Sequence, residues 1–182
     1  MVTRLDRYDN SWYSPGATAV GRIVWYFVNH LIFNHGLLPI NGLKVILLRL
    51  FGAKVGKGVV IKPCVNIKYP WRLCIGDYTW IGERVWIDNL AQVTIGAHCC
   101  LSQESLLICG NHNYKKQGFD LITGDIYLED GVWIGTRAVV CPGVWAGNHA
   151  VLAAGSVASG NLDAMTIYRG NPALPIKSRL IQ

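Results

Sequence analysis

The chain has 182 residues, of which 51% are hydrophobic and 15% charged, and its formal net charge is +6. The length predicts one domain with a substantial core, and the apolar content excludes an intrinsically disordered chain. The positive charge suits an anionic partner such as a phosphorylated cofactor or a membrane surface. Without a dense Lys/Arg block or a nucleic-acid motif, we expect no nucleic-acid binding.

The cysteines and the first residues indicate the compartment. None of the six cysteines forms a C-x-x-C pair, which argues against a zinc knuckle. The opening MVTRLDRYDNSW lacks the apolar core of a secretory signal peptide. We expect a reduced, cytoplasmic protein whose thiols pack as small apolar groups, either free or peripheral at the inner membrane face.

Residues 1–50 are predicted to form a helical segment. The apolar run 23–33 is too short to span a bilayer, which needs about 20 apolar residues. A second apolar run, 43–51, follows Pro39 and Gly42. Two interpretations remain open: a cap that buries the strand edge at the end of the next element, and an amphipathic surface that rests on the inner membrane.

A period of six residues runs through residues 51–165. The first position of each hexad is nearly always aliphatic: Val55, Ile61, Ile67, Ile75, Ile81, Ile87, Ile95, Leu101, Leu107, Leu128, Ile134, Val140, Ala146, Leu152 and Ala158. The second is often Gly, as in Gly56, Gly76, Gly96 and Gly135. The fifth is small or β-branched: Val59, Val65, Thr79, Val85, Ala91, Cys99, Ser105, Val132, Ala138, Val144, Ala150 and Ser156.

The spacing of these positions defines the fold class. Position five and the next position one are two residues apart, so on a strand both side chains face the same side. Each hexad is therefore a short strand with two inward side chains, followed by a turn that a small residue helps to form. Stacking such units produces an all-β solenoid of short parallel strands.

The repeat breaks at regular intervals. It slips by two residues after Ile67 and after Ile87, and it stops after Leu107, where the segment 108–125 intervenes. These three positions are twenty residues apart, so the breaks should stack on one edge of the solenoid. Asn89 should then lie about one rung, ~4.8 Å, from the base of the loop that carries His112. Insertions extruded from a rigid scaffold often carry function.

Several phrases resemble a known family: LLRLFGAKVGKGVVIKP, YPWRLCIGDYTWIGE, VTIGAHCCLSQ, CGNHNY, VWIG and RGNPA. They are similar to the hexapeptide-repeat acyltransferases, especially the acetyltransferases of colanic acid and related exopolysaccharide biosynthesis, and more distantly the galactoside and maltose O-acetyltransferases. The resemblance runs from about Leu43 to the end. It implies a left-handed β-helix, against the usual right-handed crossover, with residues 166–182 as a short cofactor-edge tail. It also implies acetyl-CoA as donor, no metal, and a homotrimer with active sites between subunits.

His112 is the candidate catalytic residue. Acyl transfer to a hydroxyl needs a base, and an imidazole suits that role at neutral pH. The resemblance implies the same role for a His in the extruded loop, with direct transfer in a ternary complex. A structural loop histidine is the alternative. Cys109 raises a second possibility, a Cys–His acyl-enzyme, but a packed thiol is the simpler interpretation.

Four residues are candidates for binding the acceptor. Asn89 matches a substrate-contacting Asn of the sugar acetyltransferases, and its amide can donate to and accept from sugar hydroxyls; an Asn at a strained turn is the alternative. Asp88 and Tyr114 lie beside these residues. Trp86, at hexad position six, should point outward and could stack on a sugar or a neighbouring subunit.

The last third of the chain resembles the family's cofactor-binding edge. Six residues are candidates for coenzyme A contacts: Thr136, Ala154, Ser156, Arg169, Pro172 and Lys177. Arg169 and Lys177 could reach phosphates, or they could belong to a solvated C-terminal face. Gly160 and Leu174 stand where the family often has a cation, which puts the 3′-phosphate contacts in doubt.

The resulting functional prediction is an acetyl-CoA-dependent O-acetyltransferase that acts on a sugar hydroxyl in extracellular polysaccharide biosynthesis. An N-acyltransferase on an amino sugar and a non-catalytic trimeric repeat protein remain as alternatives. His98 and His149 lack the H-x-x-x-x-H spacing of the zinc-binding repeat enzymes, so we expect no metal site.

Overall fold

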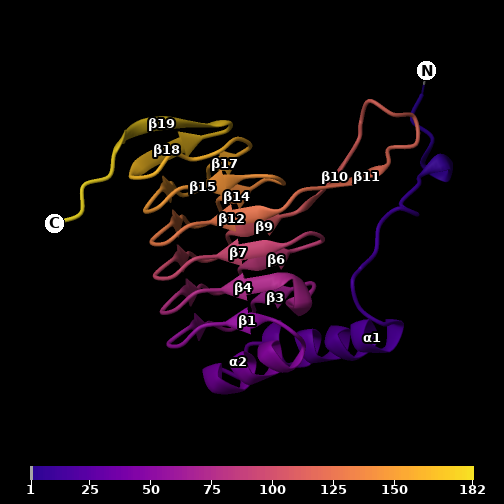
Figure 1. Cartoon of the computed structure of the whole chain (residues 1–182), viewed down its shortest axis with the longest axis horizontal. Coiled ribbons are helices and arrows are strands. Elements are labelled where there is room, and N and C mark those ends of the chain that lie inside the picture. The colour runs from indigo at the N-terminus through magenta and orange to yellow at the C-terminus, as the bar shows by residue number, and fades with distance from the viewer. Residues whose placement is uncertain (1) are drawn as a thin grey trace.

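The computed structural model describes residues 2–182 and is a parallel β-solenoid with helices at its N-terminal end (Figure 1). Face A carries β1 (Lys54–Val55), β4 (Leu73–Ile75), β7 (Val93–Ile95), β12 (Ile126–Leu128) and β15 (Trp145–Ala146). Face B carries β2 (Val60–Ile61), β5 (Trp80–Ile81), β8 (Cys100–Leu101), β13 (Trp133–Ile134), β16 (Val151–Leu152), β18 (Thr166–Gly170) and β19 (Ala173–Ser178). Face C carries β3 (Asn66–Ile67), β6 (Trp86–Asp88), β9 (Leu106–Ile108), β14 (Val139–Val140) and β17 (Val157–Ala158). The predicted solenoid is confirmed.

The hexad positions have the predicted orientations. The aliphatic first positions and the small fifth positions are buried and form one continuous core along the solenoid. Position six points outward, so Trp86 is 47% exposed. Position four lies in the corner turns and takes left-handed backbone angles: φ is 55° at His98 and 59° at His149. These two histidines therefore belong to corner turns.

The breaks in the repeat stack as the spacing predicted. Ile67 pairs in register with Ile87, and Ile87 with Leu107. The turns that follow these residues, 68–72, 88–92 and 109–125, form the C–A edge of the solenoid. The opposite border of face C, the B–C edge, is formed by the turns 82–85, 102–105, 135–138 and 153–156.

The N-terminal helices cap the first coil. They are α1 (Ala19–Val28), a π-helical turn (Asn29–Phe33) and α2 (Asn41–Leu50). The Arg49 guanidinium donates to the Val55 carbonyl, Asn41 Oδ1 accepts from the Ile61 amide at 2.7 Å, and Asn29 Oδ1 accepts from the Ile67 amide at 3.2 Å. One side chain of the helical segment thus pairs with the edge strand of each face. This arrangement agrees with the interpretation of the segment as a cap.

Within residues 2–182, no helix combines the length and the hydropathy that crossing a membrane requires.

The C-terminal segment forms more regular structure than a tail. After the last hexad the chain makes β18 parallel to β16, and β19 turns back antiparallel to β18. Tyr168 is buried, and its carbonyl accepts from the Ala153 amide at 2.8 Å. The hairpin therefore closes the end of face B, and no hexad spacing marked it in the sequence.

Candidate active site

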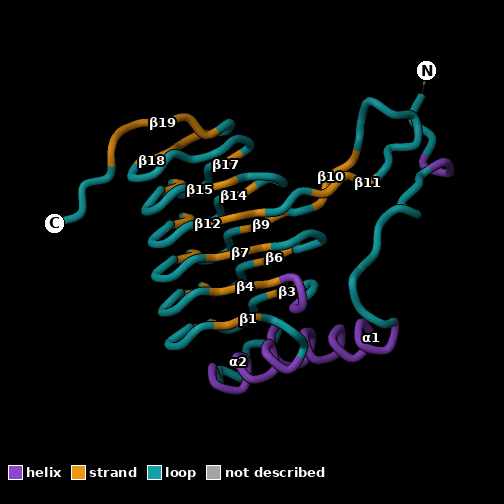
Figure 2. Tube along the Cα trace, viewed as in Figure 1, coloured by secondary structure: helices purple, strands orange, loops and turns teal. Residues whose placement is uncertain are grey.

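The extruded loop is a two-stranded hairpin on the C–A edge (Figure 2). β10 (Gly110–His112) pairs antiparallel with β11 (Leu121–Thr123), and His112 lies opposite Leu121. The Cys109 amide donates to the Asp88 carbonyl at 3.1 Å, and the Gly124 amide donates to the Cys109 carbonyl at 2.9 Å. The first bond attaches the hairpin to the rung below, and the second closes the base of the hairpin.

One hydrogen bond defines the tautomer of His112. Its Nδ1 lies 2.9 Å from the Phe119 carbonyl oxygen. Because a carbonyl only accepts, Nδ1 must carry the hydrogen, which leaves the lone pair on Nε2. The imidazole also stacks on the Phe119 ring, with centroids 4.4 Å apart and planes 8° from parallel. The loop therefore holds the ring in the form that accepts a proton at Nε2.

An N-terminal arm, residues 2–18, braces the hairpin, and sequence reasoning missed this role. The arm rises from α1 to the hairpin (Figure 1). The Arg4 amide donates to the Gln117 carbonyl at 2.8 Å, and the Asp9 amide donates to Asp120 Oδ1 at 3.2 Å. The Tyr8 ring lies 5.7 Å from the His112 ring. These contacts join residues about 110 positions apart, and no local pattern in the sequence signals them.

Asn89 has a structural environment that sequence reasoning did not anticipate. Its side chain is fully buried. Its Oδ1 accepts from the Tyr69 amide at 2.9 Å, and its Nδ2 donates to the carbonyls of Tyr69 at 2.6 Å and Arg72 at 3.1 Å. With the amide engaged on both sides by the turn 69–72, the predicted sugar contact has no surface to use. We treat Asn89 as a residue that positions the rung beneath the loop.

Replacing Asn89 with alanine should therefore reduce stability more than substrate affinity. The change removes the side-chain partners of the Tyr69 amide and the Arg72 carbonyl, so the free energy of unfolding should fall by about 1–3 kcal/mol. Chemical denaturation measures this. Asn148→Ala, at an exposed turn, is the control and should stay within about 0.5 kcal/mol of the parent. A raised acceptor KM without loss of stability would restore the binding role.

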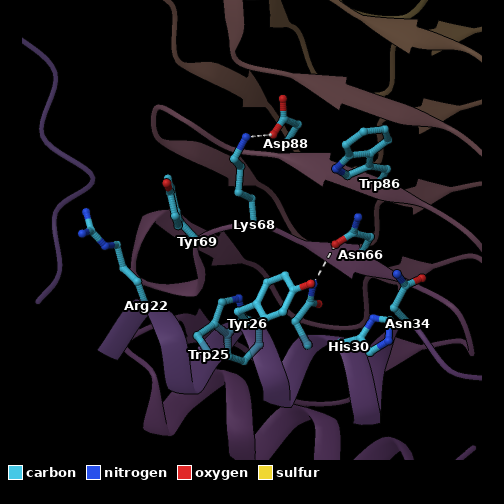
Figure 3. Close-up of a pocket in the computed structure, with 11 residues that line it drawn as sticks. Arg22, Trp25, Tyr26, His30, Asn34, Asn66, Lys68, Tyr69, Trp86 and Asp88 are labelled. Atoms are coloured by element: carbon cyan, nitrogen blue, oxygen red, sulfur yellow. Dashed lines mark hydrogen bonds and ion pairs between the residues drawn. The ribbon is translucent and has the colours of Figure 1, made fainter. Parts of the chain in front are cut away.

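Asp88 and Trp86 line a cavity of about 540 Å³ between α1 and face C (Figure 3). Lys68 Nζ pairs with Asp88 Oδ1 at 2.8 Å across the two rungs. Arg22 and Tyr26 contribute from the helix. Aromatic, amide and charged groups converge here, and such groups suit a polar ligand with apolar ring faces. The cavity lies beside the base of the hairpin, because the Asp88 carbonyl holds that base.

Besides Asn89, the predicted residues Tyr114 and His112 also lie outside this cavity. Tyr114 is on the hairpin tip and is 76% exposed. The His112 ring is on the hairpin and not on the cavity wall. The structure thus groups Asp88 with Trp86 and separates both from Tyr114.

Cys109 has the properties of a packed thiol. Its side chain is fully buried in the core beneath the hairpin, and burial raises the pKa of the thiol to about 12. A thiol in that state is almost wholly protonated at neutral pH and is a poor nucleophile.

Cys109→Ala should accordingly keep its acetyl-transfer rate within a few-fold of the parent, and hydroxylamine should trap no acyl-enzyme from the parent. Turnover with purified protein measures the first expectation, and mass spectrometry of protein mixed with donor alone measures the second. Loss of turnover in a variant with parental Tm, or a trapped adduct on Cys109, would support the acyl-enzyme instead.

The candidate cofactor residues lie on the B–C edge. Thr136 and Ala154 are exposed and occupy adjacent rungs, because the Gly155 amide donates to the Thr136 carbonyl at 2.8 Å. Arg169 and Pro172 are exposed on the closing hairpin just above. These four residues therefore form one continuous border of the solenoid.

Ser156 and Lys177 differ from the other candidates. The Ser156 side chain is buried, and its Oγ accepts from the Gly170 amide at 3.0 Å, so it anchors the hairpin and does not face a groove. Lys177 is exposed on β19, opposite Ile167. The sequence does carry a signal that separates Ser156 from its neighbours, because Ser156 occupies the inward fifth position of its hexad within the cofactor-like phrase.

Within one chain the two candidate edges are apart. His112 lies on the C–A edge and Thr136 on the B–C edge, and the width of face C separates them. Six residues would span at most ~20 Å if fully extended at ~3.3 Å per residue, and the corner turns shorten that width. A single subunit therefore does not bring the base to the candidate cofactor edge.

No family model matches the chain. The chain is 40% identical over 165 residues to the Escherichia coli (strain K12) protein "Putative colanic acid biosynthesis acetyltransferase WcaF", covering 91% of each sequence. This chain belongs to the colanic acid biosynthesis acetyltransferase family. This chain is also 28% identical over 120 residues to the Schizosaccharomyces pombe protein "Putative acetyltransferase C18B11.09c", covering 64% of this chain and 58% of that sequence.

Solved structures place the acetyltransferase among the hexapeptide-repeat acetyltransferases. The Vibrio cholerae acetyltransferase VCA0836, solved with acetyl coenzyme A, superposes with a TM-score of 0.80 at 27% identity, covering 91% of this chain and 92% of that one. A maltose O-acetyltransferase from Clostridium difficile superposes with a TM-score of 0.76 at 20% identity, covering 89% and 88%. At 20% identity, the similarity to the maltose O-acetyltransferase shows a shared fold alone.

Proposed function

We propose that the protein transfers an acetyl group from acetyl-CoA directly to a sugar hydroxyl during extracellular polysaccharide biosynthesis, with His112 as general base. The observation that carries the proposal is the 2.9 Å bond between His112 Nδ1 and the Phe119 carbonyl, because it leaves Nε2 free to accept a proton. The family membership supports the reaction class, and VCA0836 was solved with the same donor. The free cysteines and this donor favour a cytoplasmic setting.

The reaction needs a second subunit to complete the site. Both candidate edges border face C, and the outward side chains of that face include the apolar Leu106, Ile108, Val139 and Val157. If three chains surround a threefold axis with face C inward, the C–A edge of each chain meets the B–C edge of the next. His112 would then face Thr136 and Ala154 of a neighbour. A homotrimer is therefore the assembly we propose.

In the proposed step, Nε2 of His112 takes the acceptor proton while the acceptor oxygen attacks the thioester carbonyl. The tetrahedral intermediate collapses, the C–S bond breaks, and the imidazolium returns the proton to the departing thiolate. Atoms and charges balance without a metal or an acyl-enzyme. The acetyl carbon moves once, from sulfur to oxygen.

The cavity between α1 and face C is our candidate acceptor site. The exposed Trp86 indole offers a flat face to a sugar ring, and the Lys68–Asp88 pair offers a donor and an acceptor for hydroxyls. An amino sugar would fit the same groups and the same base, so N-acylation is the competing reaction. A non-catalytic role would not account for the cavity or for the fixed tautomer of His112.

Acceptor profiling tests the proposal. Thiol release from acetyl-CoA is measured with matched hydroxyl and amino sugars, presented free, nucleotide-linked and lipid-linked. We expect release with a hydroxyl acceptor and an O-acetyl product that alkali removes. An alkali-stable product formed only with the amine would establish N-acylation. Failure of the folded protein to bind acetyl-CoA would establish the non-catalytic alternative.

Mixed assemblies test the shared site. A His112→Ala chain and an Ala154→Trp chain should each be inactive as homotrimers, the second because the indole fills the candidate cofactor edge. Co-refolded together, they should regain part of the parental activity, since some interfaces join an intact base to an intact edge. Two inactive proteins that stay inactive in verified mixed trimers would contradict a site between subunits.

A further inference from the structure

The capping helices leave a large apolar surface uncovered at the N-terminal end of the solenoid. We name it the apolar end surface, and its members are each at least 45% exposed: Val20, Ile23, Val24, Phe27, Leu31, Leu37, Ile40, Ile46 and Leu50. They come from α1, α2 and the segment between them, and these elements lie together at one end (Figure 1). Exposed apolar side chains gathered at one end of a protein usually mark a binding surface.

Helix α1 is apolar on two faces. Its inner face buries Trp25 at 2% exposure, and the Trp25 indole donates to the Ile67 carbonyl at 2.9 Å. Its outer face carries Val20, Ile23, Val24 and Phe27, at helical spacings of three and four residues, and Leu31 of the π-helical turn follows four residues later. The cap needs only the inner face. A helix that is apolar all round is normally enclosed, so the outer face requires an occupant of its own.

The charge around this surface indicates which kind of partner would bind to it. Between Asp9 and Asp77 the sequence contains no acidic residue, while the same interval contains eight basic ones: Arg22, Lys44, Arg49, Lys54, Lys57, Lys62, Lys68 and Arg72. Lys44 is buried and caps the Lys62 carbonyl at 2.8 Å. Arg49, Lys54 and Lys57 are exposed close to α2, and Lys57 Nζ also lies 3.9 Å from Asp77 Oδ2. Apolar side chains framed by cations complement an anionic lipid surface.

A shallow hollow on the outer side of α1 adds a third observation. It has a volume of about 400 Å³ and is lined by Ala19, Arg22, Ile23, Tyr26 and Phe27. Arg22 and Tyr26 also line the acceptor cavity described above. An apolar floor with a guanidinium beside it fits an acyl chain below a phosphate. The hollow and the cavity adjoin at this pair of side chains.

We propose that the apolar end surface docks the protein on an anionic phospholipid bilayer. The helices lie on the lipid, with Ile23 and Phe27 among the apolar boundary groups and the exposed cations at the headgroups. The inference concerns binding alone and does not depend on the proposed transfer reaction. It has one consequence for that reaction, because docking places the acceptor cavity next to the bilayer, where a lipid-anchored acceptor could enter past Arg22 and Tyr26.

Co-sedimentation with vesicles tests the proposal. The full-length protein is mixed with phosphatidylcholine vesicles, with and without phosphatidylglycerol. We expect binding to the anionic vesicles, weakened by salt and much reduced without phosphatidylglycerol. The double variant Ile23→Ser/Phe27→Ser should lose at least about tenfold in affinity, because apolar burial drives interfacial binding. A matched double variant at the opposite end, Leu174→Ser/Ile176→Ser, should bind like the parent.

Two further measurements keep the outcome decisive. The Ile23→Ser/Phe27→Ser protein should keep its Tm, its mass in light scattering and its turnover on a soluble acceptor, since neither residue lines the acceptor cavity. Equal vesicle binding by parent and variant, or no binding by the parent, overturns the proposal. If the variant instead changes oligomeric mass, a second copy of this chain covers the surface and the lipid assignment is wrong. Inactivity of a parent that still binds vesicles would count against the proposed function alone.

Discussion

His112→Ala should lower kcat for acetyl transfer by about 10²–10⁴-fold and leave the Tm within a few degrees of the parent. The ring lies on a hairpin outside the solenoid core, so its loss removes the proposed base without opening a cavity in the core. Steady-state thiol release with acetyl-CoA and a hydroxyl acceptor measures kcat. The KM for acetyl-CoA should change little, because the proton moves only in the transition state.

A second substitution separates chemistry from loop structure. In His112→Asn the side-chain NH₂ can still donate to the Phe119 carbonyl, so the hairpin should keep its conformation while the base is absent. We expect this variant to be as inactive as His112→Ala. Lys115→Ala, on the same hairpin, is the control and should retain activity. Activity in His112→Asn comparable to the parent would show that the imidazole serves the loop and not the proton transfer.

Gly76→Ala should destabilise the solenoid by about 1–3 kcal/mol or more, because a methyl group there has no space. Gly76 is at hexad position two, where one coil passes directly over the next. A Cβ at this position would lie 2.5 Å from the Ala97 amide nitrogen and 2.5 Å from the Gly96 carbonyl carbon. Both are backbone atoms, so the coils themselves would have to separate. Thermal and urea unfolding should show the loss.

Gly160→Ala is the matched control for this prediction. A Cβ at Gly160 would meet no atom within 4 Å, and its φ lies outside the left-handed range. The added methyl should leave stability unchanged or raise it slightly, by up to about 1 kcal/mol, because it restricts the unfolded chain. If both variants unfolded at the same temperature and urea concentration as the parent, close stacking of the coils would not explain the glycines at position two.

Most of the solenoid could be predicted because its order is local and repeated. Each hexad places two small or aliphatic side chains inward, and the same spacing of two and six residues recurs from Val55 to Ala158. The breaks after Ile67, Ile87 and Leu107 could be stacked from their spacing alone, because parallel strands in register preserve that spacing. His112 was placed on the C–A edge by the same argument.

The C-terminal hairpin and the N-terminal arm could not be predicted this way. β18 and β19 have no hexad phase, and their pairing depends on the open end of face B that they cover. The arm is held by bonds such as Arg4 to Gln117. A contact between residues so distant in sequence leaves no periodic trace, so only the folded chain reveals it.

The amino-acid order alone indicated a stack of short parallel strands, its regular interruptions and a histidine in the segment that interrupts the repeat, because those features recur at fixed intervals and need only neighbouring residues. Three-dimensional packing decided which nitrogen of His112 holds the hydrogen, that the Asn89 amide serves the backbone of the rung below, and that α1 has a buried face and an uncovered one. Each of these depends on partners distant along the chain. Hydrogen bonds and burial of that kind exist only after the coils have stacked.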